Sequence, residues 1–228
     1  MRLFIGLWFW FMVYIGNAQS TVMHALTFTH IYGKNTFALD SVCYPVQHTD
    51  SISFSHLSYY ISNIELVYKN KTVWKEENSY HLIDVENIYT QAFHIYTPQS
   101  LVYDHLVLYI GIDSTTNVSG AMGGDLDPTK GMYWTWQSGF INLKLEGQYK
   151  KSGFKNQEFQ YHIGGYQNEF NTYRKISLKT AAKKDMDIWV DIEKLFSNTD
   201  LSVQHHIMSP GKEAVLVSEK FASMFKLK

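Results

Sequence analysis

The run from Gly131 to Gly147, GMYWTWQSGFINLKLEG, constrains the fold more than any other stretch. It follows a loop rich in Gly, Asp and Pro, and its second half alternates apolar with polar residues, which predicts a strand with one buried face. Continued backwards, the alternation sends Trp134 and Trp136 to the more polar face, unless a bulge at Ser138-Gly139 reverses the register. The two indoles are therefore either ordinary core aromatics or part of a functional site.

Further strand candidates recur at short spacing and are separated by turn-rich segments such as 32–35 and 164–168. With 133–146, the candidates are 21–30, 51–55, 58–68, 79–85, 101–111, 157–163, 173–179 and 186–192. Helical signals are few and short, near 127–131, 192–196 and 213–225. This pattern predicts an all-β fold, an antiparallel, immunoglobulin-like sandwich or barrel with one or two short helices.

Residues 1–19 have the layout of a secretory signal peptide, with Arg2, a short apolar run, and small and polar residues before Gln19. We expect cleavage near Gln19, which leaves 20–228 as one periplasmic or secreted domain without a membrane span; an uncleaved anchor is the alternative. The lone Cys43 cannot form an internal disulfide, so the sequence predicts a small buried residue there. A formal net charge of −1 gives no electrostatic footprint for nucleic acid.

The sequence favours metal binding over catalysis as the function. The familiar nucleophile, zinc-protease and nucleotide-binding motifs are absent from the sequence, so we do not expect an enzyme. Ten His and eight Met against a single Cys favour copper, particularly Cu(I). A blue-copper site is disfavoured because Cys43 has no nearby Met. Asp125 and Asp127 could bind calcium, but the turn that Asp127-Pro128 initiates explains them better.

Several histidines are candidate ligands. In FQYHIGGY the apolar residues take one face of the expected strand and His162 takes the other, as the two indoles do. His30 closes the first expected strand, and the pair His205-His206 precedes a Ser-Pro-Gly turn. Each of these, taken alone, is more commonly a solvated or hydrogen-bonded histidine.

Long motifs occur in a consistent order between about residue 22 and about residue 225. They are SHLSYYISNIELV at 55–67, SYHLIDVEN at 79–87, YIGIDSTTNVSGA at 109–121, GDLDPTKGMYWTWQSGFINLKLEG at 124–147, FQYHIGGY at 159–166 and IMSPGKEAV at 207–215. Together they resemble the MbnP-like copper-binding family, secreted bacterial proteins named for a partner encoded with the methanobactin copper-uptake system.

The resemblance implies a mechanism. In such proteins a partner dihaem enzyme related to MauG, of the cytochrome c peroxidase type, oxidises a Trp to kynurenine, and the product amine binds copper with His nitrogens. By motif, Trp134 or Trp136 is the oxidised residue, and His30, His162 and His206 supply imidazole. The alternative function is a cell-envelope module that binds protein or glycan through exposed aromatics without metal.

Overall fold

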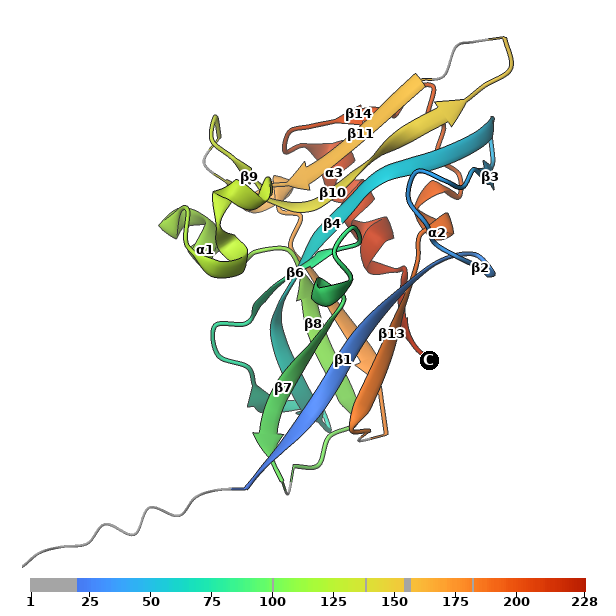
Figure 1. The fold of residues 1–228 in the computed structure, drawn as a ribbon. Helices are drawn as coiled ribbons and strands as arrows, with labels where there is room; N and C mark the ends of the chain where they lie inside the picture. Colours follow the sequence, from blue (N-terminus) through green and yellow to red (C-terminus); the bar gives the residue numbers. More distant parts are fainter. Residues whose placement is uncertain (1–19, 100, 138, 154–156, 182) are drawn as a thin grey trace, which may run out of the picture.

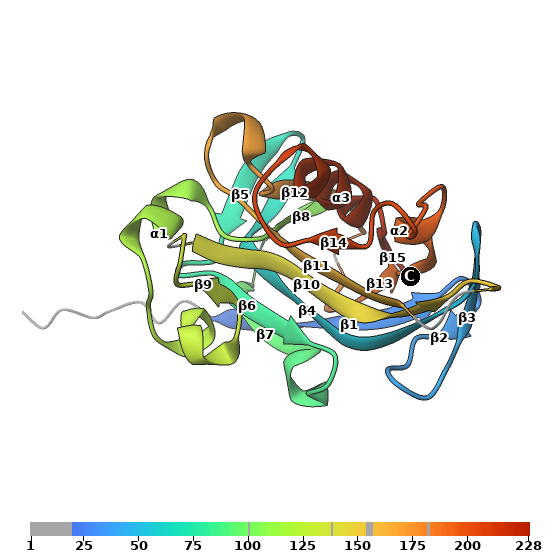
Figure 2. The ribbon, with the colours of Figure 1, turned by 90° about the horizontal axis from the view of Figure 1, so that it is seen from above.

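The computed structural model describes residues 20–99, 101–137, 139–153, 157–181 and 183–228. Two β-sheets pack against each other as a sandwich that opens toward a half-barrel, with only short helices around it (Figures 1 and 2). The prediction of an all-β class is therefore confirmed. The predicted signal segment, residues 1–19, lies outside the described residues.

The smaller sheet has the strand order β15-β13-β1-β2, and β7 also pairs with β1. Its strands are β1 (Thr21–Tyr32), β2 (Asn35–Thr36), β7 (Ala92–Pro98), β13 (Asp185–Asp191) and β15 (Phe225–Leu227). β1 and β13 are parallel, with Ala25 opposite Asp185 and Ile31 opposite Asp191. This parallel pair departs from the predicted antiparallel pairing, because strands this far apart in the chain need no hairpin to meet.

The larger sheet has the order β12-β8-β4-β10-β11-β14, with β3, β5 and β6 also paired to β4, and β9 to β10. Its strands are β3 (Tyr44–Val46), β4 (Thr49–Tyr68), β5 (Lys71–Lys75), β6 (Tyr80–Asp84), β8 (His105–Ile110), β9 (Tyr133–Trp134), β10 (Gly139–Lys150), β11 (Gln157–Gly164), β12 (Arg174–Lys179) and β14 (His206–Ile207). β4 joins two predicted strands through a bulge, since Glu146 pairs with His56 but Gly147 with Phe54. β11 and β14 are parallel.

The helices are short. They are α1 (Ser114–Ser119), α2 (Glu193–Phe196) and α3 (Lys212–Ala222), with the 3-10 turns η1 (Ile88–Thr90), η2 (Gly124–Leu126), η3 (Pro128–Lys130) and η4 (Asn168–Phe170). The sequence predicted α2, α3 and η3 and missed α1, whose N-cap is Asp113. No described helix combines the length and apolar character needed to cross a membrane.

The main core lies between the two sheets. Leu57 and Tyr59 of β4 and Leu145 of β10 are fully buried there and join Leu26 and Phe28 of β1 in one apolar cluster. We call this side of the larger sheet its inner face and the opposite side its outer face. Because side chains alternate along a strand, the intervening residues occupy the outer face. These are His56, Ser58 and Tyr60 on β4, Lys144 and Glu146 on β10, Gln160, His162 and Gly164 on β11, and His206 on β14.

The segment between β8 and β10 covers one end of the outer face. A second apolar cluster forms under it, in which Tyr60 of β4 packs with residues of the segment such as Leu126 and Trp134. The other end of the outer face remains polar. The covering segment therefore sets the border between an apolar and a polar half of the same face.

Two sequence predictions fail, one in this region and one in the loop between β2 and β3. The stretch 133–146 is not one strand: β9 ends at Trp134 and returns antiparallel to β10, with Trp134 opposite Gly139. The irregularity in β10 lies between Ile141 and Leu143, whereas the predicted bulge at Ser138-Gly139 includes Ser138, which is outside the described residues. Cys43 is exposed, not buried, because it lies in the loop between β2 and β3.

Candidate metal-binding face

His162 is held on the outer face by a carboxylate. The Nε2 of His162 lies 2.5 Å from Oε1 of Glu146, on the adjacent strand β10. A carboxylate accepts hydrogen bonds, so Nε2 carries the proton and donates it. The lone pair of the ring is then on Nδ1, for which no hydrogen-bond partner occurs among the described residues. This carboxylate–imidazole pairing is the arrangement that commonly orients histidine ligands of metals.

The imidazole of His162 is neutral near neutral pH. Burial lowers its pKa, the hydrogen bond and charge of Glu146 act in the opposite direction, and Lys144 and His56 lower it further. Only a neutral imidazole offers a lone pair to a metal ion. Because the pKa of His162 is lowered, protons compete with a metal ion for this ring less than they do at an ordinary histidine. Burial thus favours the ligand-competent form of this ring.

A thioether and an imidazole meet on the neighbouring strand. His206 of β14 pairs with Gln160 of β11, so its side chain lies on the same outer face as His162. The Nε2 of His206 is 2.6 Å from Sδ of Met208. Ile207, between them, is buried on the inner side of the strand. The alternation H-I-M therefore directs two potential ligands to one side and an apolar anchor to the other.

The two indoles have different surroundings. Trp134 is 6% exposed, whereas Trp136 is 66% exposed, and their ring centroids are 5.7 Å apart. The six-membered ring of Trp134 packs over Gly164, where an added Cβ would lie 2.6 Å from Cζ3 of the indole. Gly164 is two residues beyond His162 on β11, so Trp134 and His162 occupy neighbouring positions on the outer face. Trp136 lies outside this contact.

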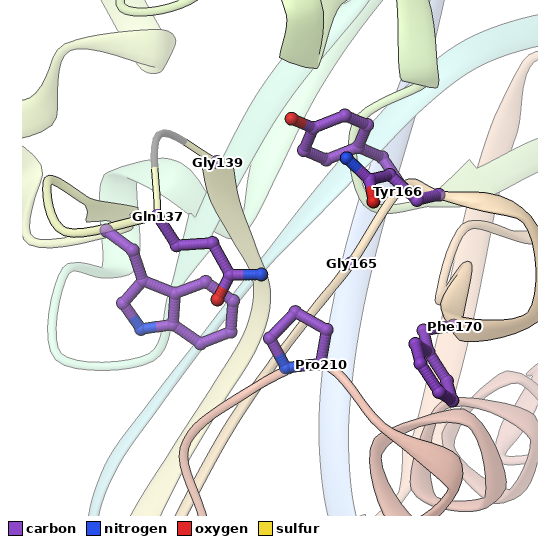
Figure 3. Close-up of a pocket in the computed structure, with 8 residues that line it drawn as sticks. Gln137, Gly139, Gly165, Tyr166, Phe170 and Pro210 are labelled. Atoms are coloured by element: carbon purple, nitrogen blue, oxygen red, sulfur yellow. The ribbon is translucent and has the colours of Figure 1, made fainter.

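A pocket of about 150 Å³ opens beside Trp134. Figure 3 shows Gln137, Tyr166, Phe170 and Pro210 around it, and the ring of Trp134 forms a further part of the wall. The backbone at Gly165 (φ +129°) approaches Phe170 so closely that an added Cβ would lie 2.3 Å from its carbonyl oxygen. Only glycine fits this floor. The pocket therefore adjoins the otherwise buried indole.

His30 does not share this face. It lies on β1 and is 5% exposed, and its Nε2 is 2.9 Å from the hydroxyl oxygen of Tyr59, on the inner face of β4. Burial lowers its pKa to about 4, with the Gln91 side chain opposing. The larger sheet therefore separates His30 from His162. The structure brings Trp134, His162 and His206 to one face and leaves His30 in the core and Trp136 at the surface.

Sequence reasoning missed other polar residues of the face. Glu146 appeared only as the polar partner in an alternating strand, and Met208 only as a neighbour of His206, although the H-x-M spacing places both on one side of a strand. His56 had no recognisable second donor in its own stretch. The interpretation of Asp125 and Asp127 as turn residues is consistent with their contacts: Asp125 binds Lys130 and the Leu82 amide, and Asp127 caps η3.

The fold and this face define an all-β protein in which one side of a mixed sheet carries imidazole and thioether groups and a buried indole. The family model described as MbnP matches residues 20–209, and the chain belongs to the MbnP family. Among solved structures, MbnP from Methylosinus trichosporium is similar, with 14% sequence identity, a TM-score of 0.59, and coverage of 86% of this chain and 88% of that chain. At this identity the likeness shows a shared fold. No curated protein matches the sequence.

Proposed function

We propose that this protein binds a single copper ion on the outer face of the larger sheet, as an exported metal-binding protein and not as an enzyme. His162 is the central ligand, and His206 and Met208 complete a set of imidazole and thioether donors. The observation that carries the proposal is the Glu146–His162 pair, which leaves a lone pair on Nδ1 of a neutral ring. The proposed export rests on the N-terminal sequence alone.

The donor types favour Cu(I). A thioether is a soft ligand, and imidazole is borderline, so a set with one sulfur and two nitrogens suits Cu(I) better than Mg²⁺ or Ca²⁺, which prefer oxygen. His206 lies in the two-residue strand β14, and Met208 comes directly after that strand. His162, in contrast, is fixed by its hydrogen bond in the centre of β11.

Trp134 is the indole that we propose as the modified residue. The neighbourhood of His162 supports Trp134 over Trp136, since Trp134 packs over Gly164 on the same face. Oxidative cleavage of the indole C2–C3 bond adds oxygen at both carbons, and hydrolysis then releases C2 as formate, which leaves kynurenine with a free aromatic amine. The unmodified ring nitrogen, in contrast, is only a hydrogen-bond donor. In this proposal a MauG-like dihaem partner supplies the oxidising equivalents, and the pocket beside Trp134 is the route by which oxygen-bearing reactants reach the ring.

A Cu(I) competition titration tests the copper site. The chain from residue 20 onward is titrated against a chromogenic Cu(I) chelator, as wild type and as His162→Ala and Met208→Leu. We expect each substitution to weaken binding at least about 10-fold, because each removes one ligand. His94→Ala is the matched control, since His94 is exposed on β7 of the other sheet. Equal affinity in the wild type and His162→Ala would refute the proposal.

The pocket favours a second candidate function. Aromatic walls with two glutamine amides also suit recognition of a glycan or a peptide, as in a cell-envelope binding module without metal. Quenching of Trp134 and Trp136 fluorescence by an oligosaccharide or peptide panel measures such binding. A flat copper titration together with quenching that Phe170→Ala abolishes would favour this second function.

A further inference from the structure

We propose a second cation site on the outer face, formed by His56, Asp84 and Glu86 and suited to a borderline divalent ion of the Zn²⁺ type. One potential ligand atom from each residue lies within 4.8 Å of the others. The site does not rest on the proposed copper site. His56 is on β4 and His162 on β11, with β10 between them, so the two sites are about 10 Å apart at the backbone.

Strand register brings the three residues together. Asp84, the last residue of β6, pairs with Ser58 of β4, and His56 is two residues before Ser58 on the same face. Glu86 follows in the turn after β6, where its amide donates to Oδ1 of Asp84 at 3.0 Å. A turn fixed by this hydrogen bond holds the two carboxylates on the side from which His56 approaches.

The spacing of the donor atoms fits a metal better than a hydrogen bond. Nδ1 of His56 lies 3.5 Å from Oε1 of Glu86, close to the separation of about 3.3 Å that two ligands of a tetrahedral zinc ion have. The other ring nitrogen, Nε2, is 2.9 Å from the hydroxyl oxygen of Ser58. With Nε2–H donated to Ser58, Nδ1 presents a lone pair toward the carboxylate, and a cation between them satisfies both groups.

The negative charge of Asp84 and Glu86 also favours a bound cation. Within the described residues, neither Asp84 nor Glu86 forms an ion pair with a Lys or Arg, and the one ionic neighbour of Glu86 is His56. Lys144, on the same face, lies 3.9 Å from Glu146 instead. Two carboxylates therefore share a partly exposed site whose basic neighbour is an imidazole.

The donor set selects the class of ion. One imidazole nitrogen and two carboxylate oxygens, with no sulfur, suit Zn²⁺ with a water in the fourth position. Ca²⁺ needs six to eight oxygens, and Cu(I) prefers sulfur. The ligands of the two proposed sites thus differ in softness. Binding of Zn²⁺ therefore measures one site and binding of Cu(I) measures the other.

Titration with Zn²⁺ against a chromogenic zinc indicator tests the site in the chain from residue 20 onward. We expect Glu86→Gln and His56→Gln each to weaken zinc binding at least about 10-fold. Glu86 is exposed, so its substitution leaves the fold intact, which circular dichroism verifies. Glu77→Gln is the matched control, because Glu77 is an exposed acidic residue elsewhere in the chain.

Co²⁺ provides a second readout, because its visible absorption distinguishes four-coordinate from six-coordinate binding. We expect a four-coordinate spectrum in the wild type and in His162→Ala, and its loss in Glu86→Gln. Zinc affinity that is unchanged in both Glu86→Gln and His56→Gln overturns the proposal, as does loss of zinc binding in His162→Ala. If the copper titration fails while zinc binding behaves as expected, only the proposed copper function is refuted.

Discussion

Protonation of His30 should destabilise the protein at mildly acidic pH. Burial lowers the pKa of His30 from 6.5 to about 4. The unfolded chain therefore binds a proton at higher pH than the folded chain does. The part of the unfolding free energy that depends on a neutral His30 is fully present above about pH 6.5. It decreases as the pH falls and is fully lost near pH 4.

The magnitude follows from the gap between these two pKa values. Between 6.5 and about 4, the loss amounts to about 3 kcal/mol of unfolding free energy, of which about 2 kcal/mol is already lost at pH 5. Such a loss is a large fraction of the total stability of a typical domain. The imidazole lies in the core beside Tyr59, and the cost of burying its charged form outweighs the stabilisation that the Gln91 side chain gives to that form.

Urea denaturation at about pH 7 and about pH 5 measures the effect. His30→Gln keeps a polar group beside Tyr59 but cannot titrate, so we expect it to lose about 2 kcal/mol less than the wild type over this interval. His94→Gln, at an exposed position, should follow the wild type. The pKa of His162 is also lowered, but its contribution is the same in all three proteins. Equal losses in the wild type and His30→Gln would refute the reasoning.

Three further predictions concern packing and the outer face. Gly147→Ala should cost about 3 kcal/mol in urea denaturation, because its Cβ would lie 2.1 Å from the Ser53 carbonyl oxygen, whereas Gly211→Ala, with open space around it, should be nearly neutral. Trp134→Ala should cost about 3–5 kcal/mol and the exposed Trp136→Ala less than about 1 kcal/mol; similar costs would contradict the assigned burial. Glu146→Gln should weaken Cu(I) binding about 10- to 100-fold in the competition titration while leaving the far-UV spectrum unchanged; wild-type affinity would show that the carboxylate does not orient His162.

Local alternation predicted much of the fold. β1, β11, β12 and β13 lie close to their predicted ranges, because each has a buried face that recurs every second residue. Short strands such as β2 and β14 were missed, since two residues carry no period. β7 also escaped detection, although its burial alternates. The parallel pairing of β1 with β13 could not be foreseen, since it depends on contacts between distant parts of the chain.

The sequence by itself determined which way His30 and His162 point within their own strands. His30 alternates in phase with Leu26 and Phe28 and was bound to be buried, and His162 alternates out of phase with Phe159 and Tyr161 and was bound to face away from the core. Only the tertiary structure decided which of these faces meet, because alternation fixes the side of a strand but not the layer or the neighbouring strand. The pairing of β10, β11 and β14 thus united Glu146, His162 and His206, and the larger sheet divided His162 from His30.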